Sequence, residues 1–320
     1  MERSIDKIID SLGITDSKVI LLAGDASTRK YYRVQGKEKS FILMQGEAFT
    51  EDDPNVSAIS SYMEMGVNVP SIYKIFPEYG VLIQEDIGDL HLQRIENKGL
   101  LRKYYKKAII QLVKLQRTAF EYQKNGKHIY PLKTSFTHEK FMSELNMTSD
   151  FYIKALNNKN ITQEKQAILN NLYNGIVNEM MKQFFLVQHR DYHSRNLMVY
   201  NSDVYMIDVQ DTRLGPFTYD VASLIIDPYI ELDEALYNEI REQYYDGIKD
   251  IVKCTYDEYS RFCDVCIVQR GIKILGTFAY QKVKRGNSNY LCYIPASIDK
   301  LKKILVRFPE WEKVVLGEIL

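Results

Sequence analysis

Acidic, amide and basic side chains near the middle of the chain follow an order that suits phosphoryl transfer. His189, Arg190 and Asp191 are followed, after four intervening residues, by Asn196, and Asp208 comes further on. This spacing matches the loop H-R-D-x-x-x-x-N, whose aspartate accepts the proton of an attacking hydroxyl group. Asp191 is therefore the predicted catalytic base, and His189 and Arg190 are predicted to support the loop structurally.

Asn196 and Asp208 stand at the two ends of a predicted β-hairpin. Two short apolar runs, residues 197–200 and 204–207, surround the turn-forming residues 201–203. Folding the hairpin would set the two side chains opposite each other at its open end. Their oxygen atoms suit Mg²⁺, which takes one or two protein ligands and completes its octahedron with water and nucleotide phosphates. Asn196 and Asp208 are therefore the predicted metal ligands. His193 is expected to be an ordinary loop residue.

The first part of the chain is predicted to be rich in β-strands. Apolar strand candidates are residues 19–22, 31–34, 41–44, 72–76 and 81–84. One helix is predicted over residues 54–65, because Asp53 is a good N-cap, Pro54 suits the first helical position and Gly66 can end the helix.

The rest of the chain is dominated by helical periodicity. The predicted helices are residues 101–123, 138–156, 162–183, 234–252, 257–284 and 296–307. The sequence therefore indicates an α+β fold with a small N-terminal antiparallel β lobe and a larger, mainly helical C-terminal lobe.

Composition is typical of a soluble enzyme. The chain has 320 residues, 45% of them hydrophobic, which can form the core of one large or two modest domains. The 42 basic and 42 acidic residues give no net charge, which argues against nucleic acid or a membrane surface as a partner. The first residues are charged, and no apolar run approaches the roughly 18 residues of a spanning helix. We therefore expect a cytoplasmic protein.

The four cysteines are not expected to form disulfides or a metal site. Cys263 and Cys266 have the C-x-x-C spacing, but they fall within a predicted helix, and no second cysteine pair or histidine lies nearby. Their predicted role is to pack in the core, where free cysteine behaves as a small hydrophobic residue.

Several motifs together resemble one family of small-molecule kinases. They are His189-Arg190-Asp191-Tyr192, Arg195-Asn196-Leu197-Met198-Val199, Ile207-Asp208-Val209-Gln210-Asp211 and Tyr219-Asp220-Val221-Ala222-Ser223-Leu224. In this respect the chain resembles the aminoglycoside phosphotransferase and choline kinase superfamily. Further motifs near residues 23–33, 66–70 and 85–89 resemble the anomeric sugar kinases of peptidoglycan recycling, which phosphorylate N-acetylmuramate and N-acetylglucosamine.

The resemblance implies a protein-kinase-like fold with two lobes that uses ATP and Mg²⁺. The implied nucleotide-binding lobe is residues 1–86, and the catalytic and acceptor-binding lobe is residues 87–320. Main-chain groups around Gln84, Glu85 and Asp86 would face the adenine. The acid equivalent to Asp220 braces the catalytic loop in this family, and Asp220 is therefore expected to have a structural role.

The loop between the first two predicted strands is the candidate phosphate-binding loop. Gly24, Asp25 and Ser27 lie in this loop, where small residues let backbone N–H groups approach phosphate oxygens. By itself, a Gly-Asp-Ala-Ser-Thr turn is usually a plain hairpin loop, and the downstream motifs favour the phosphate-binding role. Arg29 follows the loop directly and is the first candidate for a cation that holds the phosphates, ahead of Lys30, Arg33 and Lys39.

One departure from the usual kinase pattern concerns the lysine of the third strand and its partner glutamate. Met44 occupies the expected lysine position, and the following helix has Glu64 only at its end. The joint absence is physically coherent, since either charge alone in a partly buried cleft would be costly. It also leaves a nucleotide-binding pseudokinase as a distant alternative, although such a protein would not need Asp191.

The acceptor is the least determined part of the prediction. Residues 227–258 contain ten acidic and three basic side chains, which would suit a cationic aminoglycoside or choline-like acceptor if they lined a cleft. Acidic residues at this density on helices usually form a solvated face, however. An N-acetylmuramate site should instead offer a cation or an amide donor to the lactyl carboxylate. Following the resemblance, we expect a small-molecule acceptor, an N-acetylated amino sugar phosphorylated on its anomeric hydroxyl.

Overall fold

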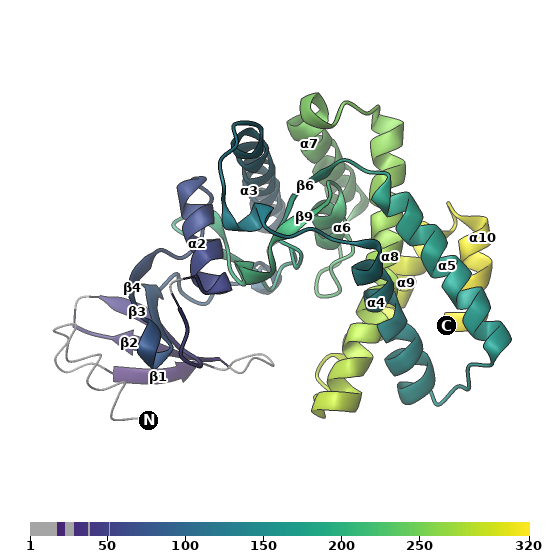
Figure 1. The fold of residues 1–320 in the computed structure, drawn as a ribbon, viewed down its shortest axis with the longest axis horizontal. Helices are drawn as coiled ribbons and strands as arrows, with labels where there is room; N and C mark the ends of the chain where they lie inside the picture. The colour runs from purple at the N-terminus through teal and green to yellow at the C-terminus, as the bar shows by residue number, and fades with distance from the viewer. Residues whose placement is uncertain (1–17, 23–28, 38, 51) are drawn as a thin grey trace. The chain divides into compact units, whose positions relative to one another are not determined.

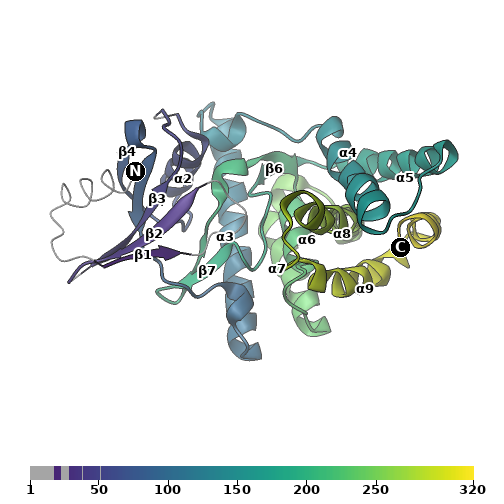
Figure 2. The ribbon, with the colours of Figure 1, turned by 90° about the horizontal axis from the view of Figure 1, so that it is seen from below.

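The computed structural model describes residues 18–22, 29–37, 39–50 and 52–320. Backbone contacts divide the chain into two compact units, residues 1–90 with 198–211 and residues 91–197 with 212–320. Figure 1 shows the elements of both units in chain order, and Figure 2 shows them after a 90° turn. The sequence-based division after residue 86 therefore differs from the structure, which divides after residue 90 and groups the hairpin with the first unit.

The hairpin groups with the first unit because its backbone bonds to that unit. The N–H of Met206 donates to the carbonyl of Asn68 at 2.9 Å, and the N–H of Val199 donates to that of Leu90 at 2.8 Å. The hairpin strands are β7 (Leu197–Tyr200) and β8 (Asp203–Met206). The turn residues Asn201 and Ser202 have φ of 48° and 60°, as a two-residue type I′ turn requires. The predicted hairpin is thus confirmed.

The first unit contains a five-stranded antiparallel sheet in the order β1-β2-β3-β5-β4. Its strands are β1 (Lys18–Leu22), β2 (Lys30–Gln35), β3 (Ser40–Gln45), β4 (Ile72–Phe76) and β5 (Val81–Glu85). All five coincide with predicted strands, apart from one or two residues at the ends. Val34, Phe41, Leu43 and Ile83 form the core on one side of the sheet. β3 is buried on both faces, because Ile42 and Met44 are also nearly inaccessible.

Helix α2 (Pro54–Glu64) begins and ends where local sequence signals predicted. The Asp53 carboxylate accepts hydrogen bonds from the N–H groups of Asn55 at 2.8 Å and Val56 at 3.3 Å. These bonds satisfy two donors that the first helical turn leaves without an intrahelical partner. Gly66 adopts φ of 67° just beyond the helix, a conformation that glycine reaches without strain.

The second unit is mainly helical, as predicted. Its long helices are α3 (Lys98–Lys124), α4 (His138–Met147), α5 (Gln163–Met181), α7 (Glu234–Val252), α8 (Tyr256–Arg285) and α9 (Ile294–Leu305). Shorter ones are α6 (Tyr219–Ile225) and α10 (Pro309–Val314), and π-helical turns cover Thr148–Leu156 and Val315–Ile319. Two strands, β6 (Phe185–Gln188) and β9 (Arg213–Pro216), pair antiparallel. Among the described residues, no helix has the length and apolar character needed to cross a bilayer.

Helix α8 is the centre of the second unit. It packs against α4, α5, α6, α9 and the π-helical segment Thr148–Leu156, and Figure 2 shows it between α6, α4 and α9. A capping box of Thr255 and Glu258 fixes its start. Cys263 and Cys266 are fully buried in it as free thiols, and burial raises their pKa values to about 12 and about 11. The predicted core role of both cysteines is confirmed.

A tight approach of α8 to the π-helical segment leads to a prediction about stability. A Cβ atom at Gly276 would lie 2.5 Å from the backbone nitrogen of Thr148, so Gly276→Ala should push the two helices apart. We expect the free energy of unfolding to fall by about 1–3 kcal/mol, measured by urea denaturation. Gly317→Ala is the matched control, because nothing lies within 4 Å of its Cβ position. Equal stability of the two variants would contradict the close packing.

Candidate active site

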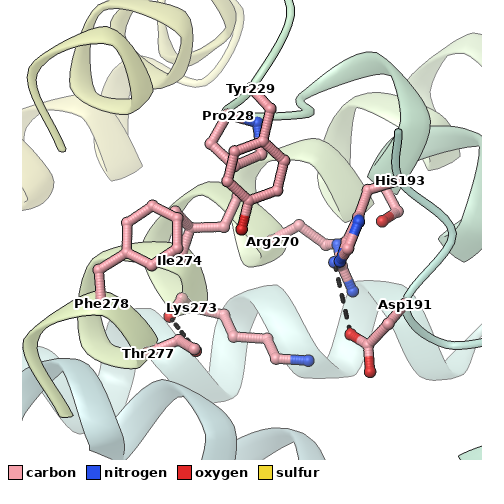
Figure 3. Close-up of a pocket in the computed structure, with 10 residues that line it drawn as sticks. Asp191, His193, Pro228, Tyr229, Arg270, Lys273, Ile274, Thr277 and Phe278 are labelled. Carbon is pink, nitrogen blue, oxygen red and sulfur yellow. Dashed lines mark hydrogen bonds and ion pairs between the residues drawn. The ribbon is translucent and has the colours of Figure 1, made fainter. Parts of the chain in front are cut away.

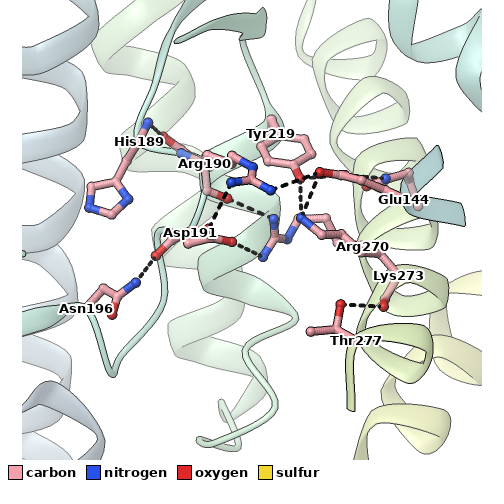
Figure 4. A network of polar contacts seen from close by, with 11 residues as sticks. Glu144, His189, Arg190, Asp191, Asn196, Tyr219, Arg270, Lys273 and Thr277 are labelled. Atoms are coloured by element: carbon pink, nitrogen blue, oxygen red, sulfur yellow. Dashed lines mark hydrogen bonds and ion pairs between the residues drawn. The ribbon is translucent and has the colours of Figure 1, made fainter. Parts of the chain in front are cut away.

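The predicted catalytic base lies in the loop between β6 and β7. The backbone carbonyl of Asp191 accepts hydrogen bonds from the N–H of His193 at 3.1 Å and from the side-chain amide of Asn196 at 3.0 Å. These two bonds hold the loop in a turn that begins at Asp191, and Figure 4 shows the bond from Asn196. The Asp191 side chain is 31% exposed. Its carboxylate is thus accessible to an acceptor.

The backbone of Arg190 has an unusual conformation that is held from both sides. Its φ is 84°, a left-handed value that is rare for a residue other than glycine. The Asp220 carboxylate accepts hydrogen bonds from the N–H of Arg190 at 3.0 Å and from the N–H of His189 at 2.5 Å. From the opposite direction, Arg270 donates to the carbonyl of Arg190 at 2.9 Å. These bonds stabilise a strained backbone next to Asp191, a common arrangement at functional sites.

Two further contacts anchor the loop. The Tyr192 hydroxyl is buried and donates to the carbonyl of Ala108 in α3 at 2.6 Å. The N–H of Ser194 donates to the buried Asp227 carboxylate at 2.6 Å. The loop is thus held by α3, α6, α8 and the segment after α6.

Three cations surround the Asp191 carboxylate. Burial alone would raise the pKa of Asp191, but the positive charges of Lys273, Arg190 and Arg270 together hold it well below its usual range. Guanidinium nitrogens of Arg190 and Arg270 each lie 3.9 Å from the carboxylate oxygens, as Figure 4 shows. Asp191 is therefore ionised at any pH near neutrality and can accept a proton or orient a hydroxyl group.

A buried glutamate behind the cations fixes their positions. Glu144 of α4 is 3% exposed and lies 3.2 Å from the Lys273 ammonium and 3.5 Å from the Arg190 guanidinium. The Tyr219 hydroxyl donates to it at 3.4 Å. Burial raises the pKa of Glu144, but the neighbouring cations outweigh burial and lower it overall. Glu144 thus remains charged and compensates part of the positive charge.

A small pocket opens to solvent beside Asp191. Its cavity volume is about 80 Å³. Figure 3 shows Arg270 and Lys273 beside Asp191. Residues one turn apart on α8 form one wall. The lining includes Asp191, His193 and Tyr229, and from α8 it includes Arg270, Lys273, Ile274, Thr277 and Phe278.

Next to this pocket, a guanidinium group fills a cluster of aromatic rings. The Arg195 guanidinium carbon lies 3.9 Å from the ring centre of Tyr229, and 5.3 and 5.4 Å from those of Tyr290 and Tyr293. Its Nε donates to the Gln93 side chain at 2.9 Å. The aromatic faces that could attract a cationic ligand are therefore already in contact with a cation of the chain.

A second pocket lies away from the catalytic loop. It is larger, with a cavity volume of about 240 Å³, and its lining includes Ile225, Ile267, Lys300 and Lys303. It is lined by no residue of the loop that carries Asp191. We therefore place the candidate active site at the smaller pocket, because that pocket contains the predicted base.

Comparison with known proteins identifies the family. The model of the phosphotransferase enzyme family matches residues 18–252. The chain belongs to this family. The resemblance stated from the sequence motifs and the expectation of an enzyme are thereby confirmed.

Individual relatives and solved structures agree with this membership. The phosphotransferase is 26% identical over 313 residues to the N-acetylmuramate/N-acetylglucosamine kinase of Pseudomonas aeruginosa, covering 96% of this chain and 89% of that protein. Its fold is similar to that of choline kinase LicA from Streptococcus pneumoniae, with a TM-score of 0.64 at 15% identity over 95% of this chain and 99% of the other. It is also similar to amicoumacin kinase hAmiN in complex with AMP-PNP, Ca²⁺ and Ami, with a TM-score of 0.63 at 13% identity over 97% of each chain. The predicted kinase-like fold is confirmed.

Family membership implies ATP and a divalent metal, and the predicted metal ligands have suitable chemistry. The amide nitrogen of Asn196 donates a hydrogen bond to the Asp191 carbonyl, which leaves its amide oxygen for another partner. Asp208 is exposed, with φ of 65°, and one carboxylate oxygen accepts a hydrogen bond from Gln210 at 2.6 Å. Amide and carboxylate oxygens are ligands that Mg²⁺ prefers. Asn196 and Asp208 belong to different units, and their joint role as metal ligands stays a prediction.

The predicted nucleotide-binding residues are only partly described. Gly24, Asp25 and Ser27 lie outside the described residues. Arg29 is described, and its guanidinium lies 4.0 Å from the Asp53 carboxylate. Its role as a phosphate-binding cation stays a prediction.

The residues predicted to face adenine, at the end of β5 and directly after it, are held by local interactions. Gln84 and Glu85 end β5, where the N–H of Glu85 donates to the carbonyl of Ser71 at 2.8 Å. The Asp86 carboxylate accepts hydrogen bonds from Arg33 at 2.8 and 3.0 Å. Arg33 was a reserve candidate for phosphate binding, but its guanidinium is committed to Asp86 and Asp89. Contact of main-chain groups in this segment with adenine stays a prediction.

Met44 is buried on β3, at the position where the sequence suggested that a lysine is replaced. It is 2% exposed and pairs with Tyr31 and Leu82. Glu64 is the last residue of α2. An uncharged side chain such as methionine can be buried to this degree on β3. An unpaired lysine could not, because burying its charge without a partner would be costly.

Sequence reasoning missed four residues of the site. Glu144, Arg270 and Lys273 were not singled out, and His193 was expected to be an ordinary loop residue but lines the pocket. One signal was present in the sequence: Arg270 and Lys273, at a spacing of three, are the charged residues in the mostly apolar stretch of residues 265–279. Buried cations in a core helix require partners, and this requirement could have marked them.

The Asp220 brace leads to a prediction about pH dependence. Burial raises the pKa of Asp220 to about 6, so its carboxylate becomes protonated as the pH falls through this value and holds the loop N–H groups less well. We expect kcat to decrease below about pH 6. Asp191 cannot cause this decrease, because its pKa lies far lower.

Asp220→Asn tests whether Asp220 causes this decrease of kcat at low pH, which is the acid limb of the pH profile. The amide has a single acceptor oxygen for the two N–H groups, so we expect kcat to fall roughly ten- to a hundredfold at all pH values. The acid limb near pH 6 should disappear in the variant. A pH profile of kcat with an unchanged limb in Asp220→Asn would assign that limb to another group.

Proposed function

We propose that this phosphotransferase is an ATP-dependent sugar kinase that transfers the γ-phosphoryl group to the anomeric hydroxyl of N-acetylmuramate or N-acetylglucosamine. The observation that carries the proposal is the ionised, accessible Asp191 at the wall of a pocket that two cations also line. The kinase of Pseudomonas aeruginosa that carries both sugars in its name is similar over almost the whole chain, which supports the choice of acceptor. The enzyme would act in the cytoplasm, where ATP is available.

Asp191 would orient the acceptor hydroxyl and accept its proton. A carboxylate with a depressed pKa is a weak base, but a loose phosphoryl-transfer transition state requires little proton removal before bond formation. An anomeric hydroxyl is more acidic than an ordinary alcohol, because the ring oxygen withdraws electrons from the same carbon. The weak base and the acidic hydroxyl are therefore a better match than the same base with an ordinary alcohol.

The remaining residues would position the reactants. Asn196 and Asp208 would hold Mg²⁺, which supplies positive charge to the phosphate oxygens when Mg-ATP is bound. Asp220 and Arg270 hold the backbone that carries Asp191. Most of the rate enhancement would come from this positioning and from the electrostatic environment.

The charges of the pocket argue against cationic acceptors. Asp191 is its acidic lining residue, whereas Arg270 and Lys273 add positive charge. Two of the acidic residues that could have lined a cleft have other roles: Asp227 braces the loop, and Glu239 pairs with Arg102. Choline-like and aminoglycoside acceptors are therefore less well matched than a neutral or anionic sugar. The pseudokinase alternative does not account for an accessible, ionised base.

Replacing the base tests the mechanism. Asp191→Asn keeps the size of the side chain but removes the proton acceptor. We expect turnover to fall by about 10²–10⁴-fold, while the affinity for Mg-ATP, measured by calorimetry, changes little. Comparable turnover in the variant would show that Asp191 is not the base.

An acceptor panel tests the substrate. We expect transfer from labelled Mg-ATP to N-acetylmuramate and N-acetylglucosamine, with phosphorus NMR placing the product phosphate on C1. Glucose, kanamycin and choline should be poor acceptors. Turnover of kanamycin or choline alone would refute the proposed acceptor but not the phosphotransferase mechanism. Metal-dependent nucleotide binding without transfer to any acceptor would favour the pseudokinase.

A further inference from the structure

The pocket wall contains a cation whose hydrogen-bonding capacity is only partly used. The Arg270 side chain is 5% exposed. One of its terminal nitrogens donates to the Arg190 carbonyl, and the other lies 3.9 Å from Asp191. Its Nε is buried and has no hydrogen-bond partner among the described residues. The two terminal nitrogens carry four N–H groups, and the Arg190 carbonyl accepts one of them, so the guanidinium group has capacity left for a ligand.

Lys273 has a similar position and one donor to spare. Its ammonium group lies 3.2 Å from both Glu144 and the Tyr219 hydroxyl, and these two contacts account for two of its three N–H donors. Lys273 follows Arg270 by three residues on α8, so both side chains share one face of the helix. Figure 3 shows both side chains directed toward Asp191.

The charges at this wall do not balance within the pocket. Arg270 and Lys273 face the pocket together with one carboxylate, that of Asp191. Glu144 lies behind them and is shared between Lys273 and Arg190. Asp220 is occupied by loop N–H groups. A second anion in the pocket would therefore be stabilised by the wall.

We propose that Arg270 and Lys273 bind a carboxylate of the acceptor, so that the enzyme prefers an amino sugar with an acidic side chain, such as N-acetylmuramate, over neutral N-acetylglucosamine. This inference rests on the proposed function. The planar guanidinium group suits a carboxylate, and the ammonium group adds charge to the same anion. The lactyl ether on C3 of N-acetylmuramate carries its carboxylate on the molecule whose C1 hydroxyl meets Asp191. Tyr229 and Phe278 offer apolar surface to the sugar.

The test compares two sugars and two forms of one carboxyl group. The kcat/KM of the wild-type enzyme is measured for N-acetylmuramate, its methyl ester and N-acetylglucosamine. N-acetylmuramate should exceed the other two by about tenfold or more, mainly through a lower KM, as expected for a charge-assisted contact. Because the ester removes the charge without changing the protein, this comparison does not depend on the folding of any variant.

The same measurements on Lys273→Gln locate the contact. We expect the preference for N-acetylmuramate over its ester to shrink by about tenfold, while activity on N-acetylglucosamine falls less. Lys282→Gln is the matched control, because Lys282 lies on the same helix outside the pocket and bonds to Ser288 at the surface. Arg270→Lys, which keeps the charge but loses the planar fork, should also reduce the preference.

The outcomes separate the inference from the proposed function. Equal loss for both sugars in Lys273→Gln would overturn the inference, because it would show that Lys273 acts on Asp191 or on the phosphates. A wild-type enzyme without a preference for the free acid would overturn it as well. Transfer to neither sugar by the wild-type enzyme would instead refute the proposed function.

Discussion

The ionised state of the Asp191 carboxylate depends on the cations around it, and much of the second unit holds these cations in place. Arg190, Arg270 and Lys273 outweigh the cost of partial burial and hold its pKa well below the usual range. Three cations would repel one another without a counter-charge, and Glu144 supplies it from α4. Buried ion clusters of this kind contribute little net stability. Their consequence here is a base that stays ionised.

The same cluster determines the backbone of the catalytic loop. Arg190 has a positive φ of 84°, its side chain contacts Glu144, and Asp191 next to it lines the pocket. Asp220 binds the N–H groups on one side, and Arg270 binds the carbonyl on the other. Arg270 therefore connects the electrostatics of the base with the strain of the loop, and it also faces the acceptor pocket. The helix α8 that carries it packs against α4, α5, α6, α9 and the π-helical segment Thr148–Leu156, among other elements.

Much of the fold could be predicted from the sequence, because its signals are local. Asp53, Pro54 and Gly66 mark the ends of α2, and the turn at residues 201–203 marks the hairpin. The unit to which the hairpin belongs could not be predicted, because it depends on hydrogen bonds with Asn68 and Leu90, which are distant in the chain. The Arg33 pair with Asp86 and Asp89 is likewise a contact between separate segments.

The sequence by itself determined the two-lobed α+β class, the order of elements and the loop that presents Asp191, because periodicity, capping and motif spacing act over short stretches of chain. It also identified the family through those motifs. Only the tertiary structure placed Glu144, Arg270 and Lys273 around Asp191. These residues come from α4 and α8, and their charges act on the carboxylate through space. No spacing along the chain encodes that distance, because it arises from the packing of helices whose contacts are far apart in sequence.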